Sequence, residues 1–176
     1  MNRKEINIKE FTTQAFDIWE NKWFLLTAGD FKKKDYNTMT VAWGSFGTMW
    51  TMPFVQVVVR PTRYTYEFME KYDHFTLSAF PKEFKKDLTL LGTKSGRDGD
   101  KIAETQLTPI ASKHIASPSF EEADLVIETQ KIYWQDMDNK NFLDPKIETK
   151  YPKKDYHRIY FGKVLGVSQI AQQDIG

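Results

Sequence analysis

The sequence predicts a mainly β protein, a small antiparallel barrel with short helical excursions. Six segments have the alternation or the β-branched and aromatic composition of strands. Helical periodicity is confined to the middle of the chain, whereas a Rossmann-type parallel sheet places a helix after almost every strand. The length of 176 residues, 40% of them hydrophobic, suits a single domain over residues 1–176 with a proper core.

A hairpin is expected first. Residues 23–28 form an apolar run that ends at Gly29-Asp30, a turn signal, so they predict a strand. The charged residues 32–35 then form the hairpin loop. Residues 38–43 are rich in β-formers and predict the second strand.

An aromatic loop and a buried strand follow. Residues 44–54 contain two glycines and a proline, Gly44, Gly47 and Pro53, which interrupt regular structure. We therefore expect a loop there. Residues 55–59 are almost wholly apolar and β-branched, which is typical of a strand buried on both faces.

Short helices occupy the centre of the chain. Pro61 ends the buried strand and Thr62 can cap a helix over residues 63–71, where Tyr64 and Phe68 have helical spacing. A half-buried strand over residues 74–80 and further helical segments complete this region. The second helix begins at Pro81 and stops at Gly92, and a third short helix is expected at residues 101–105.

The last part of the chain returns to β-structure. Residues 108–119 read as irregular, and residues 124–134 and 158–170 alternate as two long strands. Between these strands, residues 135–156 form a polar excursion with two prolines. It is long enough to be a functional connection rather than a plain turn.

Composition excludes several classes of protein. The chain has no cysteine, so disulfides, thiolate metal sites and cysteine nucleophiles are ruled out. A net charge of +1 argues against nucleic-acid binding. No apolar run approaches the roughly 18 residues of a membrane span, and the polar N-terminus does not resemble a signal peptide. We therefore expect a cytoplasmic protein that uses neither nucleic acid nor a membrane. Its three histidines are scattered, and no metal site is expected.

Arginine marks the first candidate binding segment. Only five of the 25 basic residues are arginine, and two of them, Arg60 and Arg63, flank the expected start of a helix. Free backbone amides at a helix start bind anions, and an anion would relieve the conflict between these cations and the helix dipole. Thr62 and Thr65 add hydroxyls. We interpret the segment as a phosphate site, with surface ion pairs as the alternative.

Two further segments carry hydroxyl, amide and ring groups. Thr38 and Thr40 share one face of their strand, because side chains alternate with period two, although threonine is also simply a good strand former. Trp43 beside Gly44 suits a flat ligand close to the backbone, although core packing also explains a tryptophan. Residues 95–101 add a third hydroxyl-and-cation set, whose alternative is a solvated surface turn. A ligand with both a phosphate and a planar ring fits all three.

Five motifs in register resemble the FMN-binding split-barrel family of flavin reductase-like proteins, particularly its flavoredoxin-type branch. They are NTMTVAWG (37–44), RPTRYTYEF (60–68), LSAF (77–80), KSGRDGDK (94–101) and DYHRIYFGKV (155–164). The resemblance covers roughly residues 20–166. It implies a six-stranded antiparallel Greek-key split barrel with short helical excursions, a homodimer, and FMN near the dimer interface.

The resemblance also implies roles for named residues. Those implied to line the flavin are Asn37, Thr38, Met39 and Thr40, with Trp43 and Gly44 close to the ring. Those implied to address the ribityl phosphate are Arg60, Arg63, Tyr64 and Thr65, and those implied to close the pocket are Ser95, Gly96, Arg97 and Lys101. The segment at Asp155–His157 is similar to a Gly-Asp-His motif near the nicotinamide, which makes His157 a nicotinamide contact. Tyr156 separates the acid from the histidine, which is a departure from that motif.

The implied function is hydride transfer from NADH or NADPH to flavin, with the chemistry supplied by the cofactor and no protein nucleophile. A first alternative is an FMN-binding electron carrier of flavoredoxin type, which exchanges electrons with a redox partner protein and does not turn over nicotinamide usefully. A second is a split-barrel protein that binds another planar ligand such as haem, or only dimerises.

Overall fold

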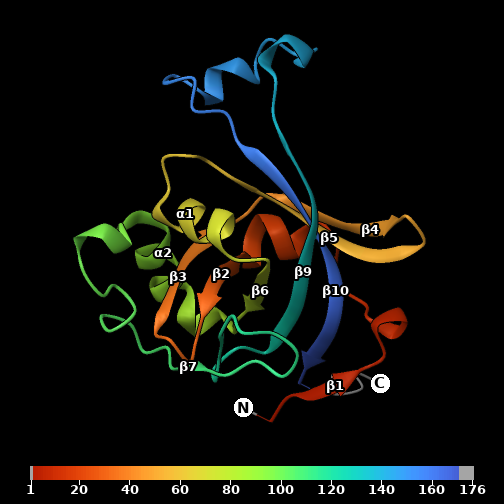
Figure 1. Ribbon diagram of the computed structural model, residues 1–176, viewed down its shortest axis with the longest axis vertical. Helices are drawn as coiled ribbons and strands as arrows, with labels where there is room; N and C mark the ends of the chain where they lie inside the picture. The colour runs from red at the N-terminus through yellow and green to blue at the C-terminus, as the bar shows by residue number, and fades with distance from the viewer. Residues whose placement is uncertain (1, 171–176) are drawn as a thin grey trace.

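The computed structural model describes residues 2–170, and an antiparallel sheet dominates them (Figure 1). Its strands are β1 (Lys4–Ile6), β2 (Phe24–Asp30), β3 (Asp35–Val41), β4 (Gly44–Met49), β5 (Met52–Val59), β6 (His74–Ala79), β9 (Leu125–Asp136) and β10 (Arg158–Gln169). Along the sheet the order is β3-β2-β6-β9-β10-β5-β4, and β1 pairs with β10. The mainly β, antiparallel prediction is confirmed, with eight strands in this sheet instead of six.

The sheet buries both of its faces, and β2 shows how. Phe24, Leu26 and Ala28 lie in the larger core cluster, whereas Leu25 belongs to a second cluster. Since neighbouring strand residues point to opposite faces, the apolar run of β2 reflects burial on both sides. Helix α2 (Lys85–Thr93) supplies Leu88 to the second cluster. Helix α1 (Tyr64–Lys71) packs against β2 and β3.

The expected loop over residues 44–54 is wrong, because β4 and β5 form a hairpin there. Trp50 and Thr51 occupy its turn with φ values of 50° and 59°. Two left-handed residues in succession give a turn whose twist matches that of the strands, a position that usually carries Asn-Gly. The turn residues therefore hid the hairpin from the sequence.

Two further strand pairs were not predicted. Residues 108–119 were expected to be irregular, yet β7 (Pro109–Ile110) pairs with β8 (Ser119–Phe120) at their ends. Strand β1 lies in the polar N-terminal segment, where no strand was expected, and pairs with the C-terminal half of β10. Strands β1, β7 and β8 are only two or three residues long, which is too short for a periodic pattern to reveal them.

The helix boundaries differ from the sequence prediction. Helix α1 begins at Tyr64 with Arg63 in the N-cap position, so Thr62 does not cap it. A 3₁₀ turn at Lys82–Phe84 precedes α2, and Gly92 lies inside the last turn of α2 instead of ending it.

The third helix, expected at residues 101–105, is absent. The Asp100 carboxylate accepts hydrogen bonds from the backbone N–H groups of Ile102 and Ala103, at 3.1 and 3.2 Å, and this local bonding forms a turn. A 3₁₀ turn at Gly96–Asp98 lies just before it.

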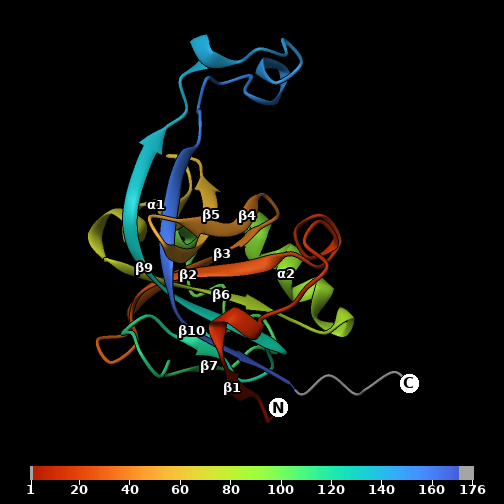
Figure 2. The same cartoon turned by 90° about the vertical axis from the view of Figure 1, so that its right-hand side faces the viewer.

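Residues 137–157 connect β9 to β10 and project from the body of the molecule (Figures 1 and 2). Two 3₁₀ turns, Asn139–Asn141 and Glu148–Lys150, shape this projecting segment. Its interior is aromatic, since the Phe142 ring stacks on Tyr151 with centroids 5.8 Å apart. The segment returns to the sheet at His157. No helix within residues 2–170 is long and apolar enough to cross a membrane.

Candidate functional site

Two adjoining cavities lie where β3, β5 and the start of α1 meet. The ring cavity, of about 190 Å³, is lined by Met39, Thr40, Val41, Ala42, Trp43, Val58, Arg60, Arg63 and His157. The anion cavity, of about 70 Å³, is lined by Asn37, Met39, Thr62, Arg63, Tyr64, Thr65, Leu91, Gly92, Thr93, Lys94, Ser95, Gly96 and Lys101. Because Met39 and Arg63 line both, one ligand could occupy the two together.

The start of α1 gives the anion cavity its donors. The backbone N–H groups of Tyr64 and Thr65 have no hydrogen-bond acceptor within residues 2–170, as the geometry of a helix start dictates. The Arg63 guanidinium donates to the Gly92 carbonyl at 3.3 Å, and it makes no ion pair with any described residue. Free amides and an unneutralised guanidinium at one helix end are suited to binding an anion.

Lys101 is the second cation of the anion cavity. Its side chain is buried, with 4% of the residue exposed, and Nζ donates to the carbonyls of Leu91 and Lys94 at 2.7 and 3.0 Å. No carboxylate among the described residues pairs with it. Burial, together with the nearby Arg63, lowers the pKa of Lys101 to about 8. A buried ammonium without a counter-ion is costly, so the site is suited to an anion that compensates it.

Asn37 and Gly96 join the walls of the anion cavity. Asn37 on β3 donates from Nδ2 to Thr65 Oγ1 on α1 at 2.7 Å. A Cβ at Gly96 would lie 2.3 Å from Asn37 Oδ1 and 2.9 Å from the Tyr64 ring. Glycine therefore permits the loop that begins at Ser95 to close against β3 and α1.

The ring cavity has an aromatic wall. The rings of Trp43 and His157 lie with centroids 5.2 Å apart and an interplanar angle of 51°. Trp43 is 48% exposed, although large apolar side chains usually avoid water. Met39 and Val58 supply apolar surface. This combination suits a flat ring with polar edges.

His157 is neutral in this setting. Its ring is buried, and burial together with the Arg60 guanidinium lowers the pKa of His157 to about 4. Its Nδ1 lies 2.8 Å from the Tyr151 hydroxyl. Asp155 makes neither a hydrogen bond nor an ion pair with the imidazole of His157. It instead forms an ion pair with Arg60 at 2.9 Å and accepts a hydrogen bond from Thr62 at 3.3 Å.

The structure brings most of the predicted site residues to the two cavities. Those that line one or both are Asn37, Met39, Thr40, Trp43, Arg60, Arg63, Tyr64, Thr65, Ser95, Gly96, Lys101 and His157. Arg60 lines the ring cavity with its charge paired to Asp155 and does not line the anion cavity. Arg63 and Lys101, which pair with no carboxylate among the described residues, are the cations available to an anion in the anion cavity.

Three predicted residues lie outside both cavities. Thr38 is fully buried and donates to the Leu26 carbonyl at 3.2 Å, so its hydroxyl serves the sheet. Gly44 abuts Trp19, whose ring would be 2.4 Å from a Cβ there, and it therefore serves packing. Arg97 forms an ion pair with Glu67 on α1.

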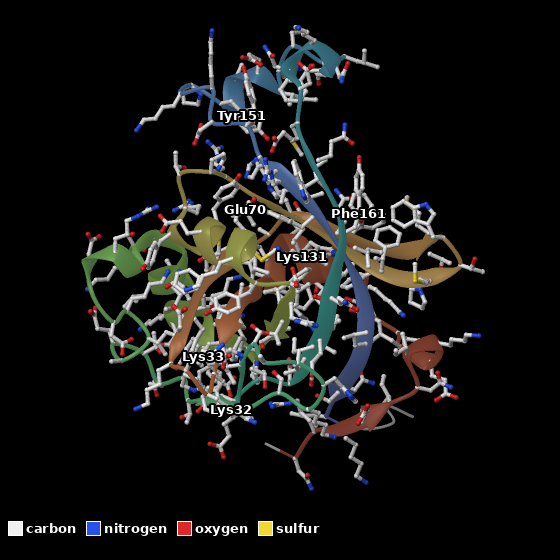
Figure 3. The ribbon with its side chains drawn as sticks, in the orientation of Figure 1. Lys32, Lys33, Glu70, Lys131, Tyr151 and Phe161 are labelled. Atoms are coloured by element: carbon white, nitrogen blue, oxygen red, sulfur yellow. The ribbon has the colours of Figure 1, made fainter. Side chains whose placement is uncertain are left out.

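Tyr151 was missed by sequence reasoning, although it contacts His157 and its ring packs beneath Arg60, 4.9 Å from the guanidinium carbon. It lies in the projecting segment (Figure 3). That segment has no periodicity from which the burial of one tyrosine could be read. The only signal was its aromatic content.

Comparison with known proteins connects this geometry with a family. A family model described as "Flavin reductase like domain" matches residues 21–175. Over 116 residues the chain is 30% identical to an uncharacterised protein of Pyrococcus abyssi, an alignment that covers 64% of this chain and 55% of that protein. The chain thus spans about half the length of this curated relative.

Solved structures share the fold. A flavoredoxin of Desulfovibrio vulgaris aligns with a TM-score of 0.67 and 20% identity, over 97% of this chain and 81% of that one. An FMN-binding domain of a flavin reductases-like enzyme from Shewanella baltica aligns with a TM-score of 0.68 and 16% identity, over 96% and 77%. An NADH:FAD oxidoreductase of Streptomyces globisporus aligns with a TM-score of 0.66 and 12% identity, over 87% and 78%. The predicted split-barrel class and the family resemblance are confirmed.

Proposed function

The chain belongs to the flavin reductase-like family, and from that premise we propose that it is an FMN-binding oxidoreductase that passes hydride from NADH or NADPH to flavin. One observation carries the proposal. The buried Lys101 and the unpaired Arg63 adjoin free helix amides in a cavity that continues into an aromatic-walled one. A phosphate joined to a planar ring matches both parts.

The residues fit FMN in two groups. Arg63, Lys101 and the amides of Tyr64 and Thr65 would hold the phosphate, since planar guanidinium and ammonium donors both suit its oxygens. Trp43 in the ring cavity would pack beside the isoalloxazine. The bound flavin supplies the hydride chemistry.

The protein's own contribution is positioning. The contact between β3 and α1 at Asn37 and Thr65 fixes the two cavities relative to one another, and the half-exposed Trp43 leaves an approach for a second ring. Holding two rings in reacting geometry is a large part of the acceleration such a reaction needs. Neutral His157 adds a polar edge to the same cavity without adding charge.

The proposal is tested with purified protein reconstituted with FMN. We expect a yellow flavin spectrum and oxidation of NADH or NADPH. The oxidation is measured as the loss of absorbance of the reduced nicotinamide. A protein that binds FMN but oxidises neither nicotinamide refutes the reductase activity. A Soret band, or no chromophore after reconstitution, refutes the flavin itself.

An electron carrier is the second candidate. It is favoured by the flavoredoxin that shares the fold and by the departure at Tyr156 from the motif expected near a nicotinamide. A carrier would accept electrons from a reduced protein partner at a useful rate and from neither nicotinamide. The same turnover assay therefore separates the two candidates.

We also propose a homodimer formed through an aromatic surface on the outside of the sheet. This aromatic surface comprises Met49, Trp50, Tyr133 and Phe161. Trp50 is 54% exposed and Tyr133 is 42% exposed, and each packs against Phe161, at 6.4 and 5.5 Å between ring centroids. Met49 belongs to β4, which is an edge strand of the sheet order. Clustered exposed aromatic rings are typical of an interface.

A further inference from the structure

The imidazole of His157 has two nitrogens in different surroundings. Nδ1 lies 2.8 Å from the Tyr151 hydroxyl. Nε2 has no hydrogen-bond partner within residues 2–170. The described polar atoms that are both unpaired and sealed from solvent are Trp19 Nε1, Ser78 Oγ and Asp87 Oδ2. Nε2 is not among them, so it is not sealed from solvent. Because His157 lines the ring cavity, Nε2 is the nitrogen that a ligand in that cavity would meet.

The proton between Tyr151 and His157 decides which tautomer is present. The Tyr151 hydroxyl has two candidate acceptors, Nδ1 of His157 at 2.8 Å and Sδ of Met137 at 3.5 Å. An imidazole nitrogen is a strong acceptor and a thioether sulfur is a weak one, so the shorter contact is also the stronger hydrogen bond. A hydroxyl that donates to Nδ1 leaves the ring proton on Nε2.

The surrounding charges favour this arrangement. Arg60 lies over the Tyr151 ring and opposes a positive imidazole, as does Arg63. Asp155 alone favours the imidazolium, and its carboxylate is held by Arg60. The Tyr151 phenol is itself neutral, because burial raises its pKa. A neutral phenol donating to a neutral imidazole is therefore the stable pair.

We propose that Tyr151 is a positioning residue that donates its hydroxyl proton to Nδ1 of His157 and so presents a neutral Nε2–H donor to the ring cavity. Such a donor is suited to a carbonyl oxygen or imine nitrogen at the edge of a planar heterocycle. No proton is transferred. The identity of this heterocycle as flavin or nicotinamide rests on the proposed function, whereas the tautomer does not.

The tautomer is measured directly by long-range ¹H–¹⁵N correlation spectra of the histidine rings in the full-length, flavin-free protein. His157→Gln identifies the His157 signals among the three histidines. The expected spectrum at pH 7 has a protonated Nε2 and an unprotonated Nδ1. The ring should remain neutral on lowering the pH to 5, in line with its pKa of about 4.

Tyr151→Phe removes the donor and keeps the aromatic packing. The His157 pKa should rise by roughly 0.4–1 unit, the equivalent of one neutral hydrogen bond, and the Nδ1–H tautomer should become populated. Tyr156→Phe is the matched control. Tyr156 is the residue before His157 in the sequence, but its hydroxyl donates to Glu148 at 2.6 Å. Removing this hydroxyl should leave the His157 spectrum unchanged.

Three results would overturn the inference. They are an Nδ1–H ring in the wild type, an imidazolium at pH 7, or a Tyr151→Phe spectrum identical to that of the wild type. If Tyr151→Phe does not fold, the wild-type tautomer decides alone. Flavin binding is measured separately, so a chain that binds no FMN refutes the proposed function while the tautomer result stands.

Discussion

Asn37 on β3 donates a 2.7 Å hydrogen bond to Thr65 in the first turn of α1, and this contact joins two segments 28 positions apart in the chain. Both side chains are buried. The contact places a strand that lines the ring cavity against the helix start that lines the anion cavity. The hydrogen bond therefore helps to hold the walls of the two cavities together.

Arg63→Ala should weaken FMN far more than riboflavin, because only FMN carries the phosphate. Loss of a charge-assisted hydrogen bond costs about 1.5–3 kcal/mol, or roughly 10- to 150-fold in affinity. Titration of both ligands by flavin fluorescence measures the difference. Lys33→Ala, in the exposed β2–β3 hairpin loop (Figure 3), is the control. Equal losses for the two ligands would contradict the role of Arg63.

Arg60→Ala should affect FMN and riboflavin alike. Its guanidinium is already paired with Asp155 and lies in the ring cavity, so the variant disturbs the ring surroundings rather than the phosphate. The same titrations compare it with Arg63→Ala. A phosphate-specific loss in Arg60→Ala would show that Arg60 leaves Asp155 to bind the ligand.

FMN affinity should decline as the pH rises through about 8, the pKa that burial gives Lys101. Above that pH the ammonium loses its proton and the phosphate loses one of its two cations. Riboflavin affinity should stay flat from pH 7 to 9. Lys101→Met should weaken FMN at pH 7 and remove the decline, whereas an unchanged slope in this variant would assign it to another group.

The same residue contributes to the pH dependence of stability in the flavin-free protein. The pKa of Lys101 in the folded state lies below its ordinary 10.5, so the unfolded chain binds more protons between about pH 8 and 10.5. Unfolding free energy from this group therefore rises with pH across that window. Urea unfolding at pH 8 and 10 should show a larger rise in the wild type than in Lys101→Met. A rise of equal size in the variant would contradict the assignment.

Trp50→Ser should shift the protein from dimer to monomer, because it removes a half-exposed ring from the centre of the aromatic surface. Sedimentation velocity measures the change. Phe16→Ser, which removes an aromatic ring that is 87% exposed elsewhere, is the control and should stay dimeric. A monomeric wild type at micromolar concentration would remove the basis for this interface.

Local patterns predicted the parts of the fold whose side chains follow a regular period. The apolar run of β2 and the spacing of Tyr64 and Phe68 in α1 identified these elements within one or two residues. The β4–β5 hairpin was missed because Trp50 and Thr51 adopt a turn that their residue types do not favour. Such a turn is stabilised by the pairing of the flanking strands, which no short window of sequence contains.

The sequence indicated which segments meet at the two cavities, but it did not show how their side chains are paired. The family resemblance implied that Arg63 and Ser95 belong to one pocket, and the structure brings both to the anion cavity. The resemblance could not reveal that Asp155 pairs with Arg60, or that Lys101 is buried without a carboxylate partner among residues 2–170. Those facts depend on contacts between segments 95 positions apart in one case, and on burial in the other.

The most direct measurement of the central claim is calorimetric titration of the wild-type protein with FMN and with riboflavin at pH 7. If Arg63, Lys101 and the α1 amides hold a phosphate, FMN binds at least about tenfold more tightly than riboflavin. Equal affinity for the two, or binding of neither, would contradict a flavin mononucleotide site in these cavities.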